Sequence, residues 1–255
     1  MRFASLGSGS RGNSLIVETG QTRLMLDCGF GIRETVFRLS RLGLAPEDLA
    51  GILITHEHSD HVGGAAKFAR RYHLPIWLTH GTARAASSQL EAAPQLHLID
   101  SHSRFQIGDL QIEPFPVPHD AHEPVQYAFG DGGRRLGVLT DTGGSTPHIE
   151  EVLSGCDALV LECNHDPEML RLGAYPLSLK KRIAGRFGHL DNHGAAGLLA
   201  KLDNSKLQHL IAAHLSEKNN TPALAQSALS KVLGCDPEWI GVADQENGFA
   251  WRQIL

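Results

Sequence analysis

Residues 55–61 are Thr-His-Glu-His-Ser-Asp-His, so three histidines and an aspartate fall within six consecutive positions. The preceding residues, Gly51–Thr55, predict a short buried strand, and the glycines at 63 and 64 predict a turn into a helix. Side chains alternate along a strand, so His56 and His58 can point the same way. A histidine-rich surface loop is the alternative interpretation, and the buried strand before the cluster argues against it.

Asp60 and His61 follow as the chain turns, and they can reach a second point close to the first. Two imidazoles plus an imidazole and a carboxylate make half of the ligand set of a dinuclear metal site. Nitrogen and oxygen ligands of this kind suit Zn²⁺, Mn²⁺ or Fe²⁺ rather than Ca²⁺. The cluster therefore predicts two divalent metal ions per chain, with further ligands from elsewhere in the sequence.

The composition of the whole chain excludes several classes of protein. The chain has 255 residues, is 42% hydrophobic and 20% charged, and carries a formal net charge of −5, which gives no general signal for nucleic acid. It lacks an apolar leader and any apolar stretch of about 18 residues. Its four cysteines are widely spaced, with no Cys-x-x-Cys pair, which argues against a disulfide framework. We expect a cytoplasmic protein with no membrane span and no obligatory protein partner.

Hydrophobic periodicity predicts two β-rich halves, each followed by helices. Strands are expected at Arg2–Leu6, Leu15–Thr19, Arg23–Asp27, Gly51–Thr55, Ile76–Thr79, Leu96–Ile99, Leu110–Val117, Val125–Phe129, Leu136–Thr140, Ala158–Glu162, Leu207–Ala213, Trp239–Ala243 and Phe249–Gln253. Helices are expected at Ile32–Leu42, Gly63–Tyr72, Thr82–Gln89, Pro147–Leu153, Leu177–Phe187, Asn192–Leu202 and Pro222–Leu233. This order favours two sheets packed face to face with helices outside, and the lack of a linker favours one domain over residues 1–255.

Three polar residues come directly after apolar strands, as the histidine cluster does. They are His119, Asp141 and His214. If these strands end at one edge of the sandwich, the three side chains meet the cluster there and complete a two-metal site.

At this point the chain resembles a known family. Thr55-His-x-His-x-Asp-His61, a later histidine, Thr140-Asp-Thr-Gly143 and a final histidine form a pattern similar to that of the metallo-β-lactamase-fold hydrolases. The resemblance extends over nearly the whole chain. It implies the α/β class and a four-layer αββα sandwich with the metals at one edge.

The resemblance also implies a role for each ligand. His56, His58 and His119 would hold one metal, Asp60, His61 and His214 the other, and Asp141 would bridge them. Asp27 matches the acidic position that orients the histidine loop in this family.

Several branches of the family do not match. True two-zinc β-lactamases use a cysteine ligand, whereas Asp141 stands at the bridging position here. Diiron oxygen reductases have glutamate where this chain keeps His58. Long RNA-processing members insert a large domain between the last two motifs, and the interval from Asp141 to His214 is too short for one.

The last third resembles the YycJ/WalJ-type branch. The similar segments are Leu161-Glu-Cys-Asn-His-Asp166, Tyr175-Pro-Leu-Ser-Leu-Lys-Lys-Arg-Ile183, Gly188-His-Leu-Asp-Asn192 and Ala213-His-Leu-Ser-Glu-Lys-Asn-Asn-Thr-Pro222. This branch is implied to act as a 5′→3′ exonuclease on double-stranded DNA, so duplex DNA with a free 5′ end is the expected partner. Asp191 departs from the serine expected at that step, although an aspartate can cap the next helix equally well.

A local excess of positive charge agrees with a polyanionic substrate. Between Met169 and Leu190 there are five basic residues and no acidic one, which is unusual in a chain of net charge −5. Such a run can track a phosphate backbone, although a solvated helix face is the alternative. The residues expected to contact or position substrate are Asn164, His165, Asp166, Lys180, Lys181, Arg182 and Asn192.

His189 is the candidate general acid. Hydrolysis of a phosphodiester needs a proton for the leaving alkoxide, and an imidazole can supply it. A structural histidine is the alternative. We name Asp60 and His189 as the catalytic residues, and we expect the glycine-rich turn Gly7–Asn13 near the metals, with Ser10, Arg11 and Asn13 able to touch substrate.

The expected activity is metal-dependent cleavage of phosphodiester bonds, as a 5′→3′ DNA exonuclease, through two-metal activation of a bridging hydroxide. The alternative is a small-molecule hydrolase of the same fold, such as a cyclic-phosphate diesterase, thioesterase or lactonase. A non-catalytic metal-dependent binding protein would show broken ligand positions, and all seven are intact here.

Overall fold

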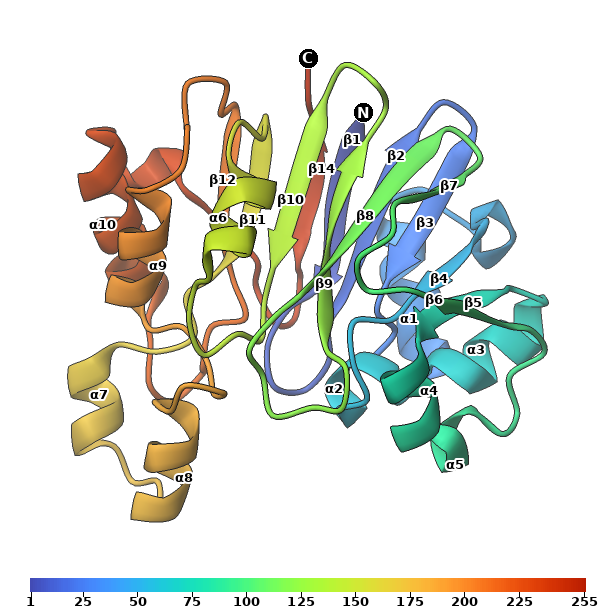
Figure 1. The fold of residues 1–255 in the computed structure, drawn as a ribbon, viewed down its shortest axis with the longest axis horizontal. Helices are drawn as coiled ribbons and strands as arrows, with labels where there is room; N and C mark the ends of the chain where they lie inside the picture. Colours follow the sequence, from blue (N-terminus) through green and yellow to red (C-terminus); the bar gives the residue numbers. More distant parts are fainter.

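Two mixed β-sheets of seven strands each pack face to face in the computed structural model, which describes the whole chain, residues 1–255 (Figure 1). The first sheet has the order β14-β1-β2-β3-β4-β5-β6, with β1 at Arg2–Gly7, β2 at Ser14–Thr19, β3 at Thr22–Leu26, β4 at Gly51–Leu53, β5 at Ile76–Thr79, β6 at Leu96–Ile99 and β14 at Phe249–Gln253. The second has the order β13-β12-β11-β10-β9-β8-β7, with β7 at Phe105–Ile107, β8 at Leu110–Pro116, β9 at Val125–Gly130, β10 at Arg135–Leu139, β11 at Ala158–Glu162, β12 at His209–Ala213 and β13 at Gly241–Val242.

Helices cover the outer face of each sheet. The first sheet is covered by α1 (Ile32–Arg41), α3 (Ala65–Tyr72), α4 (His80–Ala85) and α5 (Ser87–Leu90), and the second by α6 (Pro147–Leu153), α9 (Asn192–Leu199) and α10 (Pro222–Leu233). Two 3₁₀ turns lie at Pro46–Asp48 and Pro237–Trp239. The short α2 (Ser59–Val62) lies at one edge of the sandwich, and α7 (Pro167–Leu172) and α8 (Leu177–Ile183) project beyond the sheets at that same end (Figure 1). No helix has the length and apolar character that crossing a bilayer requires.

Alternation along the strands builds three apolar layers. On β3, Leu24 and Leu26 point into the core between the sheets, whereas Met25 packs under the outer helices. On β10, Val138 lies in the inter-sheet core and Leu139 packs under the helices of the second sheet. Because each sheet buries both faces, the middle of most of its strands is apolar, and the four-layer αββα sandwich is confirmed.

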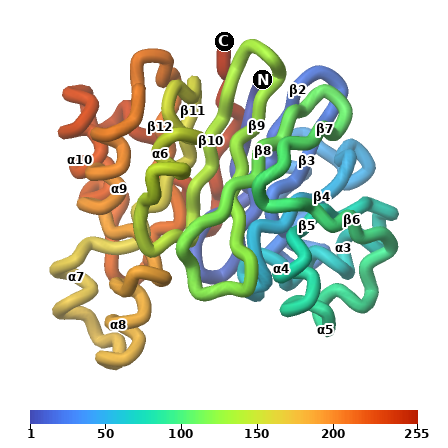
Figure 2. The backbone as a smooth tube through the Cα atoms, in the orientation of Figure 1, coloured from blue at the N-terminus to red at the C-terminus, as the bar shows by residue number.

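The chain ends lie side by side, far from α2 (Figure 2). Strand β14 pairs antiparallel with β1, so that Arg2 faces Gln253 across the ladder. Pairing with β1 closes the edge of the first sheet with the last strand of the sequence.

Strand direction brings the polar strand ends together. Strands β3 and β4 run parallel, as do β10, β11 and β12, so the carboxyl ends within each set lie at one edge of a sheet. Asp27, Asp141 and His214 lie just beyond three of these ends and adopt left-handed φ angles of 59°, 51° and 55°. Non-glycine residues rarely adopt this region, and such backbone strain gathers at functional sites.

Most predicted elements are confirmed, several with identical bounds, and a few differ. The predicted helix Gly63–Tyr72 begins two residues later, at Ala65, as α3, and the helical turn α2 before it was not predicted. Gly64, between them, packs so closely on the chain that an added Cβ would lie 1.9 Å from the Phe30 carbonyl oxygen. The predicted helix Thr82–Gln89 is two short helices, α4 and α5, with Ala86 between them. The predicted strand Trp239–Ala243 is reduced to β13, and the short elements β7 and α7 were not predicted.

The predicted helix Leu177–Phe187 ends early, at Ile183. There the chain turns back, so that the amides of Gly188 and His189 bond the carbonyls of Gly185 and Ile183. This turn carries His189 back toward the edge of the sheets.

Candidate metal centre

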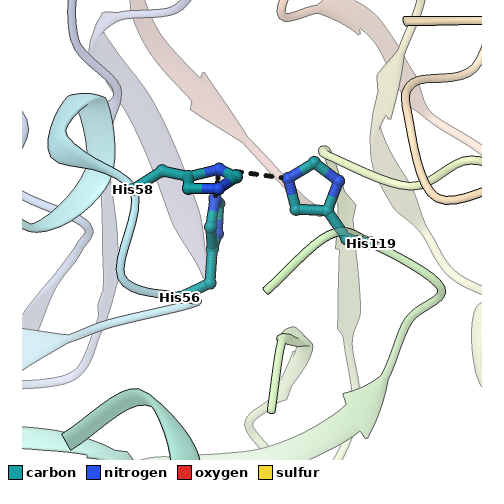
Figure 3. Close-up of side chains that lie close together, drawn as sticks. All are labelled: His56, His58 and His119. Atoms are coloured by element: carbon teal, nitrogen blue, oxygen red, sulfur yellow. Dashed lines mark hydrogen bonds between the residues drawn. The ribbon is translucent and has the colours of Figure 1, made fainter. Parts of the chain in front are cut away.

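Three imidazoles from three different positions in the chain converge at the sheet edge (Figure 3). Nδ1 of His58 lies 3.0 Å from Nε2 of His56 and 3.2 Å from Nε2 of His119. His56 follows β4, His58 precedes α2 and His119 follows β8. A nitrogen from each ring faces the same small volume, and such a trio can hold one divalent cation.

Hydrogen bonds on the far side of two rings set which nitrogen faces inward. The Thr55 hydroxyl donates to Asp27 at 2.9 Å, so its lone pairs are left to accept from Nδ1–H of His56 at 2.9 Å. Nδ1–H of His119 donates to the Gly188 carbonyl oxygen at 3.1 Å. Both rings therefore present the lone pair of Nε2 to the site, which is the form that ligates metal.

A second donor group lies beside the first. Asp60, His61 and His214 each offer a ligand atom, and these atoms lie within 4.8 Å of one another. Asp141 lies between the two groups, with Oδ2 at 3.2 Å from Nε2 of His61 and Oδ1 at 4.0 Å from Nε2 of His119. The structure thus brings all seven predicted ligands together.

Two buried atoms test whether a cation fits this set. Oδ2 of Asp141 and Nε2 of His214 are sealed from solvent and have no hydrogen-bond partner. An unpaired buried carboxylate oxygen is costly unless a partner satisfies it. Both orphaned atoms face the donor cluster, so the residues present fit a divalent metal centre.

The carboxylates control the charge of the cluster. Burial lowers the pKa of His214, but Asp141, Asp60 and Glu162 outweigh burial and raise it to about 10. Burial likewise opposes protonation of His61, and the carboxylates around it hold its pKa well above the ordinary value. A cation that binds here replaces these protons, so metal affinity is expected to fall as the pH falls.

Asp27 orients the histidine loop. Its carboxylate accepts hydrogen bonds from Nδ1–H of His61 at 2.7 Å and from the backbone amide of Thr55 at 2.9 Å. The bond to His61 leaves Nε2 of that ring facing Asp60 and Asp141. Asp27 therefore acts on the donor groups through Thr55 and His61 and does not face the cation volume itself.

Glu162 is a buried site residue that the sequence interpretation did not assign. Its Oε1 accepts from Nδ1–H of His189 at 2.8 Å and from Nδ1–H of His214 at 3.1 Å. Its Oε2 accepts from the amides of Thr142 and Leu190. Burial raises the pKa of this carboxyl, but the charge of His189 and the bonds from both histidines outweigh it and lower the pKa to about 2.

His189 stands at the boundary of the site with one nitrogen free. Nδ1 is held by Glu162, while Nε2 makes no hydrogen bond within the protein. Burial lowers the pKa of His189, but the Glu162 carboxylate outweighs burial and raises it above the ordinary value. Glu162 therefore favours the protonated form of the ring.

The polar residues predicted to touch substrate lie behind the site. Asn164 donates its amide to the carbonyl of His214, and Asn192 pairs with Asn220. Asp166 caps α7, and Asp191 caps α9 through the amide of Gly194, as expected. His165 is buried and donates Nδ1–H to Asn164.

Ion pairs occupy part of the basic stretch. Arg182 pairs with Asp120 beside the donor cluster, and Arg171 pairs with Glu168, which lies just before the stretch. Lys180 donates to a backbone carbonyl, whereas Lys181 and Arg186 have no carboxylate partner. Three of the five predicted basic residues are therefore free of ion pairing.

A cavity of about 330 Å³ opens onto the donor groups, and we call it the site cavity. Tyr175, Leu179, Arg182 and Ile183 form one wall, and Ser10 of the glycine-rich turn lies in another. Asn13 of the same turn lies deeper, with Nδ2 3.1 Å from Nε2 of His61. Arg11 points outward to Glu217 and Glu246.

The chain is similar to known proteins over most of its length. Residues 22–214 match the family model described as a beta-lactamase superfamily domain. The chain is 39% identical to Exodeoxyribonuclease YycJ of Bacillus anthracis, over 91% of this chain and 89% of the relative, and 33% identical to Exodeoxyribonuclease WalJ of Streptococcus pneumoniae, over 94% and 91%. The crystal structure of the metallo-beta-lactamase fold protein YhfI from Bacillus subtilis superposes with a TM-score of 0.74 at 14% identity, covering 98% of both chains. The chain therefore belongs to the metallo-β-lactamase superfamily and is a hydrolase of that fold.

Proposed function

We propose that this protein is a metal-dependent nuclease that removes nucleotides from the 5′ end of duplex DNA. In this proposal one divalent ion is held by His56, His58 and His119. A second is held by Asp60, His61 and His214, and Asp141 bridges the two. The ions are Zn²⁺, Mn²⁺ or Fe²⁺, in keeping with nitrogen and oxygen ligands.

One observation carries the two-metal assignment. Two separate donor groups converge on Asp141, and the orphaned Oδ2 of Asp141 and Nε2 of His214 both lie inside the cluster. Each group has three donors of its own, which is enough to hold one cation. Two cations with a shared carboxylate account for all seven residues.

The chain's own residues supply positioning and a proton. Two bound divalent ions would provide hydroxide at neutral pH and neutralise charge on the phosphoryl oxygens. Glu162 fixes the ring of His189 through Nδ1, so that the free Nε2 can deliver a proton to the departing oxygen. Thr55 and Asp27 hold the histidine loop in place through hydrogen bonds.

DNA as the substrate rests on the relatives and on local charge. The two curated relatives are exodeoxyribonucleases by name and are matched over most of their length. Lys180, Lys181 and Arg182 lie on α8, which forms a wall of the site cavity. In our proposal α8 contacts the phosphate backbone, while Asn164, Asp166 and Asn192 position the loops behind it. The 5′→3′ direction of digestion in this proposal is taken from the resemblance to the YycJ/WalJ-type branch.

A small-molecule phosphodiester or ester is the second candidate. The site cavity, at about 330 Å³, falls at the low end of the range of about 300–1,000 Å³ typical of small-molecule sites. The net charge of −5 also gives the protein no long-range attraction for a polyanion such as DNA.

Digestion of end-labelled duplex DNA with Mn²⁺ separates these candidates. Wild-type protein should shorten a 3′-labelled strand stepwise from its 5′ end, and an Asp60→Ala variant from the same host should not. Glu47→Gln, an exposed change far from the site, should match wild type. Intact DNA together with hydrolysis of a cyclic nucleotide, a thioester or a lactone would favour the small-molecule hydrolase instead.

A further inference from the structure

A second cavity of about 330 Å³ adjoins the site cavity on the far side of His189. We call it the leaving-side groove. Its walls are the Gly143–Ser145 loop, Ala184, Leu190, Asp191, the face of α9 that carries Gly194 and Gly197, and Lys201. His189 lines both cavities, and the adjacent residues Ile183 and Ala184 line one each, so the two cavities are neighbours that meet at the histidine.

His165 presents an unpartnered acceptor in this groove. The residue is 2% exposed and lines the groove, yet its ring makes a single hydrogen bond, from Nδ1 to Oδ1 of Asn164 at 3.3 Å. The Asn164 amide nitrogen donates to the His214 carbonyl, so its oxygen must be the acceptor and Nδ1 of His165 carries the proton. Burial lowers the pKa of His165, so the ring is neutral and Nε2 offers a lone pair.

The groove does not suit a phosphate. The charge of Lys201 is balanced by Glu150 at 2.7 Å, and the Asp191 carboxylate is a further anion on the wall. A buried acceptor and small backbone walls, with no unpaired lysine or arginine, suit an uncharged group with hydroxyl or amino donors. The sugar and base of a nucleotide carry such donors.

We propose that the leaving-side groove binds the nucleoside part of the nucleotide that departs from the scissile phosphate, with a base amino group, or the 3′ hydroxyl that cleavage releases, donating to Nε2 of His165. This inference rests on the proposed nuclease function. In the hydrolysis, a bond forms between hydroxide oxygen and phosphorus, and the bond from phosphorus to the leaving oxygen breaks. The proton from Nε2 of His189 passes to that oxygen, which lies at the boundary where His189 faces the groove.

Gly197 allows the groove to be closed without disturbing the fold. An added Cβ at Gly197 would meet no atom within 4 Å, and the residue is exposed on α9. Gly197→Leu therefore places a side chain in the groove at no packing cost, and replacing glycine in a helix favours the helix. Ala200→Leu, at an exposed position at the end of the same helix outside the groove, is the matched control.

The test compares two substrates in each variant with Mn²⁺ bound: duplex DNA, and bis(p-nitrophenyl) phosphate, whose small leaving group needs neither a nucleoside subsite nor a proton. Gly197→Leu should lower kcat/KM on DNA about 100-fold, as a misplaced substrate does, and leave the aryl ester unchanged. His165→Phe should lower it about tenfold, the value of one hydrogen bond to a buried acceptor. Ala200→Leu should match wild type on both substrates.

Three results would overturn the inference in distinguishable ways. DNA digestion by Gly197→Leu at the wild-type rate would show that the groove holds no nucleoside, while the nuclease function stands. Equal losses on both substrates would show a general defect in place of a lost subsite. Wild-type protein that hydrolyses the aryl ester but leaves DNA intact would end the proposed function, and this inference with it.

Discussion

Oε1 of Glu162 lies 2.8 Å from Nδ1 of His189, and this buried carboxylate also holds Nδ1 of His214 at 3.1 Å. One glutamate therefore orients a candidate proton donor and a candidate metal ligand together. His189→Ala should lower kcat on DNA by about 10²–10⁴-fold and leave the metal content unchanged, because His189 is not one of the seven proposed metal ligands.

Glu162→Gln should cost about 10–100-fold in activity or metal affinity, as loss of a residue that orients metal ligands does. The control for His189→Ala is His193→Ala, which removes an exposed histidine on α9. Steady-state kinetics on DNA and elemental analysis of the purified variants measure both effects. Wild-type kcat in His189→Ala would rule out the proton-donor role.

Asp27→Asn should weaken metal binding about 10–100-fold. An amide can accept from Nδ1–H of His61 or from Thr55, but it loses the charge that holds both at once. Competition with a chelator measures the affinity, and circular dichroism checks that the chain remains folded. Glu151→Gln, the same chemical change on an exposed helix position, should bind metal as wild type does. Unchanged affinity in Asp27→Asn would contradict the orienting role.

Lys181→Ala should weaken DNA binding and flatten its salt dependence. Lys181 is exposed on α8 and has no carboxylate partner, so it is free to contact a phosphate. Loss of one phosphate contact should reduce the slope of log K against log salt by about 0.9 for duplex DNA. Binding of labelled duplex to the Asp60→Ala protein, with and without Lys181→Ala, gives the slope, and Lys67→Ala on α3 is the control. Equal slopes in all three proteins would place the DNA elsewhere.

Glu18→Gln should destabilise the fold at neutral pH by about 1 kcal/mol, the value of a paired carboxylate near the surface. Burial raises the pKa of Glu18, but Arg2 and Arg23 outweigh burial and lower it. A carboxyl group with a lowered pKa in the folded state adds stability above its unfolded pKa of about 4.3. That stability is lost as the pH falls through the lower, folded value.

Urea unfolding at neutral and acid pH therefore provides the measurement. The difference between wild type and Glu18→Gln should shrink as Glu18 becomes protonated. The exposed change Glu47→Gln should show no such dependence. If the difference in unfolding free energy stayed constant with pH, the substitution would have removed packing contacts and not a charge interaction.

Much of the site could be predicted because one rule places its residues. A polar side chain just beyond an apolar strand lies at the sheet edge, and this rule pointed to His119, Asp141 and His214. Glu162 obeys the same rule after Ala158–Leu161, and it was missed because it was counted as the last residue of the strand. The pattern of hydrophobic alternation likewise predicted the layers and most of the strands.

The remaining features depend on partners that a sequence does not show. Counting charges between Met169 and Leu190 gives five basic residues. The count does not show that Arg182 forms an ion pair with Asp120, which lies 62 residues earlier in the chain. The left-handed conformations of Asp141 and His214 arise from tertiary packing that overrides the local preference of non-glycine residues. The roles of Asn164 and Asn192 depend on hydrogen bonds to His214 and Asn220, far along the chain.

Titration of metal-depleted protein with Mn²⁺, with stepwise shortening of a 3′-labelled strand of duplex DNA as the readout, tests the two-metal nuclease most directly. The account predicts that shortening appears with the second equivalent of metal and reaches its maximum at two per chain. A maximum at one equivalent, or intact DNA when two ions are bound, would contradict it.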